Sequence, residues 1–230
     1  MQERTLAVRF WGHGALWSIP HFMGEPHSLP CPTPSATDRM MGSLYGKPEF
    51  EYETRRIHFY KPIRYDNIQQ RSVITKSAVT DRTLQTYTAL VDVEYIVEVV
   101  IRTNPLRRHS EVAENRGHIR GDGEYFGIAR DRLRRKREFR QPFLGKSRFP
   151  ASWELVEGEI PQPLPINMDI GPIPFNKLPL DIDKDQYEER FFHARITNGT
   201  LHVPETLYTE RFREARFTQR HRVSGGNRAS

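Results

Sequence analysis

Apolar and polar residues alternate along two segments of the chain. In residues 6–11 Leu, Val and Phe occupy every second position, and in residues 87–103 β-branched residues alternate with acidic ones. A period of two places successive side chains on opposite faces of a strand. We therefore predict strands at 6–11 and 87–103, and weaker patterns of the same kind predict strands at 50–63 and 153–160.

Two other segments repeat apolar residues at helical spacing. Thr33 before Pro34 is an N-cap followed by proline at the first helical position, and Gly46 is a stop signal, which predicts a helix at 34–46. A second helix is predicted to begin near residue 124 and to run toward Pro142. Its buried face is formed by Tyr125, Ile128, Ala129 and Leu133.

The order of these elements indicates the fold class. Strand, helix, strand, strand, helix, strand is the βαββαβ order of ferredoxin-like and RRM folds, which belong to the α+β class. Residues 64–86 lack apolar periodicity and are predicted to form a protruding hairpin or loop, and residues 104–123 a polar loop. We predict an RRM-like domain at 1–160, then a small antiparallel β appendage and basic tail at 161–230, with a hairpin turn at Asn198-Gly199.

Residues 130–148 concentrate the positive charge of the chain. They contain nine Lys/Arg and two acidic residues, a local charge of +7, whereas the whole chain carries +6. A solvated helix surface usually has acidic residues four positions from its cations, so a polyanion such as RNA is the favoured partner. Gly145 lets the backbone approach such a ligand closely. The residues predicted to bind RNA are Arg130, Arg134, Arg135, Arg137, Arg140, Gly145, Lys146 and Arg148.

Several classes of protein are disfavoured by the composition. No run of about 20 apolar residues is present, so we expect no membrane partner and a cytoplasmic location. The single cysteine, Cys31, excludes an internal disulfide, and the histidines lack the spacing of a zinc site. We expect neither a metal nor another cofactor.

Several segments resemble a known family. LAVRFWGHGALW, PTPSATDRMMGSLYGKPEF, RIHFYKPIRYDNI, VDVEYIV, RQPFLGKSRFPASWE and FFHARITNGTLHVP, in this order and spacing, resemble the family-five CRISPR-associated protein of subtype I-C. The resemblance covers about residues 5 to 204. It implies an RRM-like fold that binds the repeat-derived 5′ handle of the CRISPR RNA (crRNA) in the Cascade surveillance complex, beside its backbone and large subunits. It also implies cleavage of precursor crRNA at the repeat hairpin.

The family's cleavage site, as the resemblance implies it, combines a tyrosine, a lysine and a histidine in metal-independent attack by a 2′-hydroxyl. The tyrosine matches Tyr45 in SLYGKPE. Counting back from the PFLG motif without a gap places the lysine and histidine at Glu124 and Tyr125. With a gap, Arg108 and His109 supply a cation and an imidazole, and His118 with Arg120 is a third alternative. We take Tyr45, Arg108 and His109 as the candidate catalytic residues.

Two functions therefore follow from the sequence. The first is a structural subunit that binds the 5′ handle of crRNA, either with cleavage of the precursor or without it. The second is a free-standing RNA-processing nuclease. A DNA-binding regulator is disfavoured, because no helix-turn-helix pattern is present and the basic helix belongs to a sheet topology.

Overall fold

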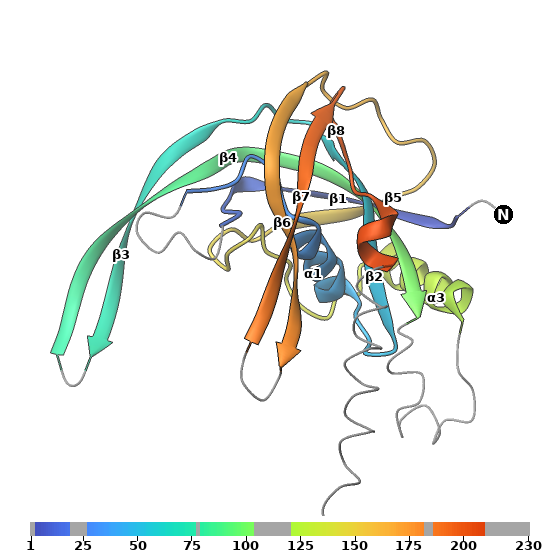
Figure 1. Ribbon diagram of the computed structural model, residues 1–230, viewed down its shortest axis with the longest axis horizontal. Coiled ribbons are helices and arrows are strands. Elements are labelled where there is room, and N and C mark those ends of the chain that lie inside the picture. The colour runs from blue at the N-terminus through green and yellow to red at the C-terminus, as the bar shows by residue number, and fades with distance from the viewer. Residues whose placement is uncertain (1–2, 19–26, 77–78, 104–120, 182–185, 210–230) are drawn as a thin grey trace, which may run out of the picture.

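The structure is a computed structural model, and it describes residues 3–18, 27–76, 79–103, 121–181 and 186–209. Figure 1 shows one curved antiparallel sheet with helices beside it. The elements in chain order are β1 (Thr5–Ala15), α1 (Pro34–Leu44), β2 (Phe50–Phe59), β3 (Tyr65–Lys76), β4 (Val79–Thr103), α3 (Asp122–Arg134), β5 (Ser152–Val156), β6 (Met168–Asp181), β7 (Gln186–Thr197) and β8 (Thr200–His202).

The described strands form a single sheet in the order β5-β1-β4-β2-β8-β7-β6, in which every pair is antiparallel. β3 pairs only with the first half of β4, and this long hairpin projects from the body of the molecule (Figure 1). The predicted α+β class and the protruding hairpin are both confirmed. The 87–103 strand is the second half of β4, and the segment 161–204 forms antiparallel strands that extend the same sheet.

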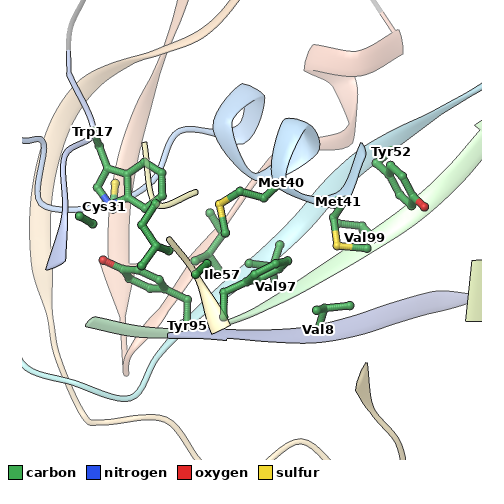
Figure 2. Packing of buried hydrophobic residues seen from close by; sticks show 14 of the residues in the cluster. Val8, Trp17, Cys31, Met40, Met41, Tyr52, Ile57, Tyr95, Val97 and Val99 are labelled. Atoms are coloured by element: carbon green, nitrogen blue, oxygen red, sulfur yellow. The ribbon is translucent and has the colours of Figure 1, made fainter. Parts of the chain in front are cut away.

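The alternation in β4 places the core on one face of the sheet. Val93, Tyr95, Val97, Val99 and Ile101 are all buried in one apolar cluster with residues of α1 and α3. Figure 2 shows Met40 and Met41 of α1 directed toward Ile57, Val97 and Val99. Burying these apolar side chains is the main source of stability for such a sheet and its helices.

Helix α1 follows its predicted signals. The Thr33 side chain accepts a hydrogen bond from the Ala36 N–H at 3.2 Å, and Pro34 begins the helix. The helix ends at Leu44 because Tyr45 is extended, with φ −154° and ψ 109°. It is therefore two residues shorter than predicted.

Helix α3 is also shorter than predicted, and the prediction that it runs toward Pro142 is wrong. It ends at Arg134, and Lys136 adopts a left-handed φ of 49°. The chain then turns toward α1, where the Phe139 and Arg140 N–H groups donate to the carbonyl oxygens of Leu44 and Ser43 at 3.0 and 2.9 Å. These carbonyls lie in the last turn of α1 and have no partner within that helix, so the turn is stabilised by long-range hydrogen bonds.

The C-terminal strands complete the sheet. Asn198 and Gly199 both have positive φ and connect Thr197 to Thr200 in a two-residue turn between β7 and β8, as predicted. β8 pairs with β2, and residues 205–209 are helical. The division into domains at 1–160 and 161–230 stays a prediction. No helix in the described ranges is long and apolar enough to cross a membrane.

Candidate functional site

Tyr45 lies where α1 meets β2. Its N–H donates to the Met41 carbonyl oxygen at 3.1 Å, and its own carbonyl oxygen accepts from the Tyr52 hydroxyl at 2.7 Å. Burial raises the pKa of Tyr52, so its hydroxyl remains a donor. The Tyr45 side chain is only 2% exposed, and its ring centroid lies 5.5 Å from that of Phe50. The phenol is thus held rigidly and shielded from solvent in this state.

Arg132 and Phe139 both contact the ring of Tyr45. The guanidinium carbon of Arg132 lies 5.1 Å from the centroid of the Tyr45 ring and 4.6 Å from that of Phe139. Phe139 also contacts Tyr45, with centroids 5.5 Å apart, and is 49% exposed. We call Tyr45, Phe50, Tyr125, Arg132 and Phe139 the Tyr45 cluster.

Tyr125 joins the cluster from the first turn of α3. Its ring centroid lies 4.9 Å from that of Phe50, which also contacts Tyr45. The preceding Glu124 accepts a hydrogen bond from the Gly121 N–H at 3.3 Å and caps the helix. The positions that align without a gap to the family's lysine and histidine are thus a capping carboxylate, Glu124, and a buried ring, Tyr125, that contacts Phe50.

The other predicted catalytic residues lie outside the described part of the chain. These are Arg108 and His109, together with the alternatives His118 and Arg120. Their catalytic roles stay predictions. The cation-rich sequence around Arg132 does not single it out, although its spacing of seven residues from Tyr125 places it on the buried face of α3.

The predicted RNA-binding cations differ in how their charge is compensated. Arg134 forms an ion pair with Glu157, which lowers the pKa of that carboxyl, and Arg135 pairs with Asp131 at 3.2 Å. The Arg148 guanidinium lies 4.0 Å from the Tyr87 ring centroid. Arg130, exposed on α3, lies 5.9 Å from the Phe126 ring centroid.

The exposed side chains of Arg137, Arg140 and Lys146 have no acidic partner among the described residues. Lys146 lines a pocket at the N-terminus of α1, together with Thr33, Ser35 and Arg39. Arg39, which sequence reasoning missed, reaches this pocket from α1. Among the described residues, the exposed Arg137, Arg140 and Lys146 without an acidic partner thus lie in the turn after α3 and in the PFLGKSRF loop.

The structure shows why position 145 requires a glycine, which the sequence did not reveal. Its φ is +90°, and a Cβ there would overlap the Leu16 carbonyl oxygen. The loop is fixed to the end of β1 by the hydrogen bond from the Leu16 N–H to the Leu144 carbonyl oxygen at 3.0 Å. The glycine permits this packing, which is a structural role in addition to the predicted ligand approach. Its part in RNA binding stays a prediction.

A second charged cluster lies on the sheet face opposite the helices. The His58 Nε2 lies 2.6 Å from a Glu98 carboxylate oxygen, and its Nδ1 lies 3.0 Å from the Thr200 hydroxyl. Arg56 binds the same carboxylate through two hydrogen bonds of 2.6 Å. Burial opposes ionisation of Glu98, but the bonds to His58 and Arg56 outweigh it and lower its pKa to about 2. This network joins β2, β4 and β8.

Comparison with known proteins identifies the class and then the family. The fold is similar to a crystal structure of a CRISPR-associated protein (TM-score 0.65, 18% identity, 88% of this chain and 92% of that one). It is also similar to a chain of a CRISPR RNA-guided surveillance complex (TM-score 0.50, 14% identity, 91% and 98%). The fold is thus one found among CRISPR-associated proteins.

The sequence relatives are more specific, although no protein-family model matches the chain. The chain is 32% identical to the CRISPR pre-crRNA endoribonuclease Cas5d of Thermus thermophilus, over 90% of this chain and 95% of that protein. It is 24% identical to the protein of the same name from Mannheimia succiniciproducens, over 86% and 94%. The chain therefore belongs to the Cas5d family, which confirms the resemblance found in the sequence.

Proposed function

We propose that this chain binds the repeat-derived 5′ handle of crRNA and cleaves precursor crRNA as a subunit of a Cascade surveillance complex. The relatives are named pre-crRNA endoribonucleases, and a structural neighbour is a chain of a surveillance complex. The observation that carries the proposal is the pair of hydrogen bonds from Phe139 and Arg140 to the end of α1. They hold the cation-rich turn after α3 directly beside Tyr45.

The proposed reaction needs no metal. The 2′-hydroxyl next to the scissile phosphate attacks phosphorus and gives its proton to a base. The P–O5′ bond breaks as the leaving 5′-oxygen takes a proton from an acid, and a 2′,3′-cyclic phosphate remains. A cation must neutralise the charge that builds up on phosphorus-bound oxygens. Tyr45 acts in proton transfer, with Arg108 and His109 as its proposed partners. Because Tyr45 is buried, RNA binding must expose its hydroxyl.

We also propose that the strands and helices beside the site form a ferredoxin-like unit. It comprises β1, α1, β2, β4, α3 and β5, whose strands lie side by side in the order β5-β1-β4-β2. The β3–β4 hairpin is then an insertion between the second and third strands of a βαββαβ arrangement. This arrangement supports the predicted RRM-like domain.

The function can be tested with purified protein and a hairpin repeat RNA. We expect the wild-type chain to cleave the RNA in EDTA, to leave a cyclic phosphate, and to leave intact an RNA with a 2′-deoxy residue at the cut. Tyr45→Phe should slow cleavage by about a hundredfold or more while affinity for the uncleavable RNA is kept. His109→Ala should have the same effect.

Tyr52→Phe is the matched control for Tyr45→Phe. It also removes a buried hydroxyl, which donates to the Tyr45 carbonyl, and should cost about 1 kcal/mol of folding stability without abolishing cleavage. If His109→Ala cuts normally and His118→Ala does not, the gap in the alignment lies elsewhere. A wild-type protein that binds tightly yet leaves every repeat intact would instead be the structural, non-catalytic subunit.

A further inference from the structure

Arg132 occupies an unusual place for a cation. Its guanidinium lies against two aromatic rings, and its Nη2 donates to the Arg137 carbonyl oxygen at 3.3 Å. Its Nε is buried and has no hydrogen-bond partner among the described residues. Native proteins pair nearly all buried donors, so such a group requires a functional or structural explanation. An exposed arginine would meet its hydrogen-bonding needs with water.

The proposed reaction needs a cation at this place. The positions that align without a gap to the family's lysine and histidine hold Glu124 and Tyr125, and neither can neutralise a phosphate. Among the described residues, the guanidinium that contacts the Tyr45 ring is that of Arg132. An arginine stays charged at all relevant pH values and offers paired N–H donors that match phosphate oxygens.

Solvent exposure also favours Arg132 as the residue that contacts the phosphate. It is partly exposed and contacts Phe139, which is 49% exposed, whereas Tyr45 is 2% exposed. A phosphate that arrives from solvent at the Phe139 side therefore reaches the guanidinium before it reaches the phenol. The neighbouring Arg137 and Arg140 belong to the same turn and add positive charge at that side.

We propose that Arg132 is a second cation of the cleavage site, in addition to Arg108, and that it neutralises the scissile phosphate beside Tyr45. This inference rests on the proposed nuclease function. It assigns Arg132 a catalytic role, in which the unpaired donor becomes hydrogen bonded when the phosphate binds. The stacking on Tyr45 and Phe139 holds the guanidinium in place before RNA arrives, which reduces the reorganisation needed in the transition state.

The test compares two arginines that each lie over an aromatic ring. Arg132→Ala should reduce the single-turnover cleavage rate at saturating RNA by about a hundredfold, while affinity for the 2′-deoxy RNA changes only a few-fold. Arg132→Lys should keep part of the activity. Guanidinium ion at millimolar concentration should restore cleavage to Arg132→Ala. Arg9→Ala is the control, because the Arg9 guanidinium carbon also lies over an aromatic ring, 5.0 Å from the centroid of Trp11 on β1, and is not among the predicted RNA-binding residues. It should cleave at the wild-type rate and gain nothing from guanidinium.

Each outcome decides one point. If wild-type protein binds the RNA and does not cleave it, the proposed function fails. If wild type cleaves and folded Arg132→Ala or Arg132→Gln cleaves equally fast, the assignment of Arg132 is overturned. Circular dichroism and thermal melting show whether a variant is folded. If Arg132→Ala unfolds, Arg132→Lys and Arg132→Gln decide instead, since equal rates for the charged and the neutral variant would also contradict the role.

Discussion

Single residues in this protein are constrained by contacts that are distant in sequence. Gly145 and Gly158 illustrate this, because both have a φ near +90°, yet their surroundings differ. A Cβ at Gly145 would overlap the Leu16 carbonyl oxygen, whereas a Cβ at Gly158 would meet no atom within 4 Å. A non-glycine residue would therefore have a strained backbone at both positions, but its Cβ would clash with a neighbour only at position 145.

We predict that Gly158→Ala lowers the free energy of unfolding by about 1–2 kcal/mol, the cost of the left-handed backbone alone. Gly145→Ala should cost clearly more, because the loop must also move away from β1. Urea denaturation of the two variants measures the difference. Equal losses of stability would mean that the contact with Leu16 does not constrain the loop, and that Gly145 serves RNA approach instead.

Glu98 is a second residue whose environment makes a measurable prediction. Its pKa in the folded protein is about 2, against a reference value of 4.5. A lowered carboxyl pKa stabilises the fold above the unfolded-state value, and this contribution is lost as pH falls from about 4.5 to about 2. By linkage it amounts to roughly 3 kcal/mol.

The Glu98→Gln variant should lack this part of the acid dependence. We expect its stability to fall less than that of wild type between pH 5 and pH 3 in urea denaturation. Glu154→Gln is the control, because Glu154 forms a partly exposed ion pair with Arg9, and ion pairs near the surface contribute little. If both variants keep the wild-type slope, the His58–Glu98–Arg56 network does not govern acid stability.

At the scale of elements, the basic segment divides into two parts. Arg134 and Arg135 in and just after α3 have acidic partners, whereas Arg137 and Arg140 in the following turn have none among the described residues. An arginine that is already paired gains less from a phosphate. The turn after α3 is thus a stronger candidate for phosphate contact than the helix surface.

We predict that the double variant Arg137→Glu/Arg140→Glu weakens RNA binding more than Arg134→Glu/Arg135→Glu. Its salt dependence should flatten by about 1.4 in the slope of log K against log salt, as expected for two lost phosphate contacts to single-stranded RNA. Filter binding at several salt concentrations measures both quantities. If Arg134→Glu/Arg135→Glu weakened RNA binding more, the main phosphate contact would instead lie on α3.

At the scale of the whole molecule, the segments before and after residue 160 share one sheet and one core. β8 pairs with β2, and Phe175, Phe192 and Tyr208 are buried in the same cluster as the residues of α1. The Tyr208 hydroxyl donates to an Asp38 carboxylate oxygen at 3.1 Å and accepts from the Thr54 N–H at 2.9 Å. Such contacts couple the unfolding of the two segments.

We therefore expect a chain that ends at residue 160 to lose the cooperative thermal transition of the full chain. Its β2 edge would be unpaired, and the Thr54 N–H and the Asp38 carboxylate would each lose a hydrogen bond to Tyr208. Calorimetry of both chains tests this. A truncated chain that melts at the full-length temperature would establish 1–160 as an independent domain, as the sequence predicted.

The sequence by itself determined the elements and the family. Period-two and helical patterns are local properties of the chain, so they located β1, β4, α1 and the start of α3, and the Asn198-Gly199 turn has its own local signal. The motifs around Tyr45 and Gly145 pointed to a CRISPR-associated protein, because a motif is a run of neighbouring residue types and does not depend on tertiary contacts.

Only the tertiary structure decided which elements meet. The path of the turn after α3 is fixed by hydrogen bonds to the carbonyl oxygens of Ser43 and Leu44, almost a hundred residues earlier in the chain. Arg132 stands out from eight neighbouring cations only because Tyr45 and Phe139 lie against it, and Glu98 is strongly acidic only because β2 brings two partners to it. Such contacts arise from packing between distant segments, and local periodicity does not encode them.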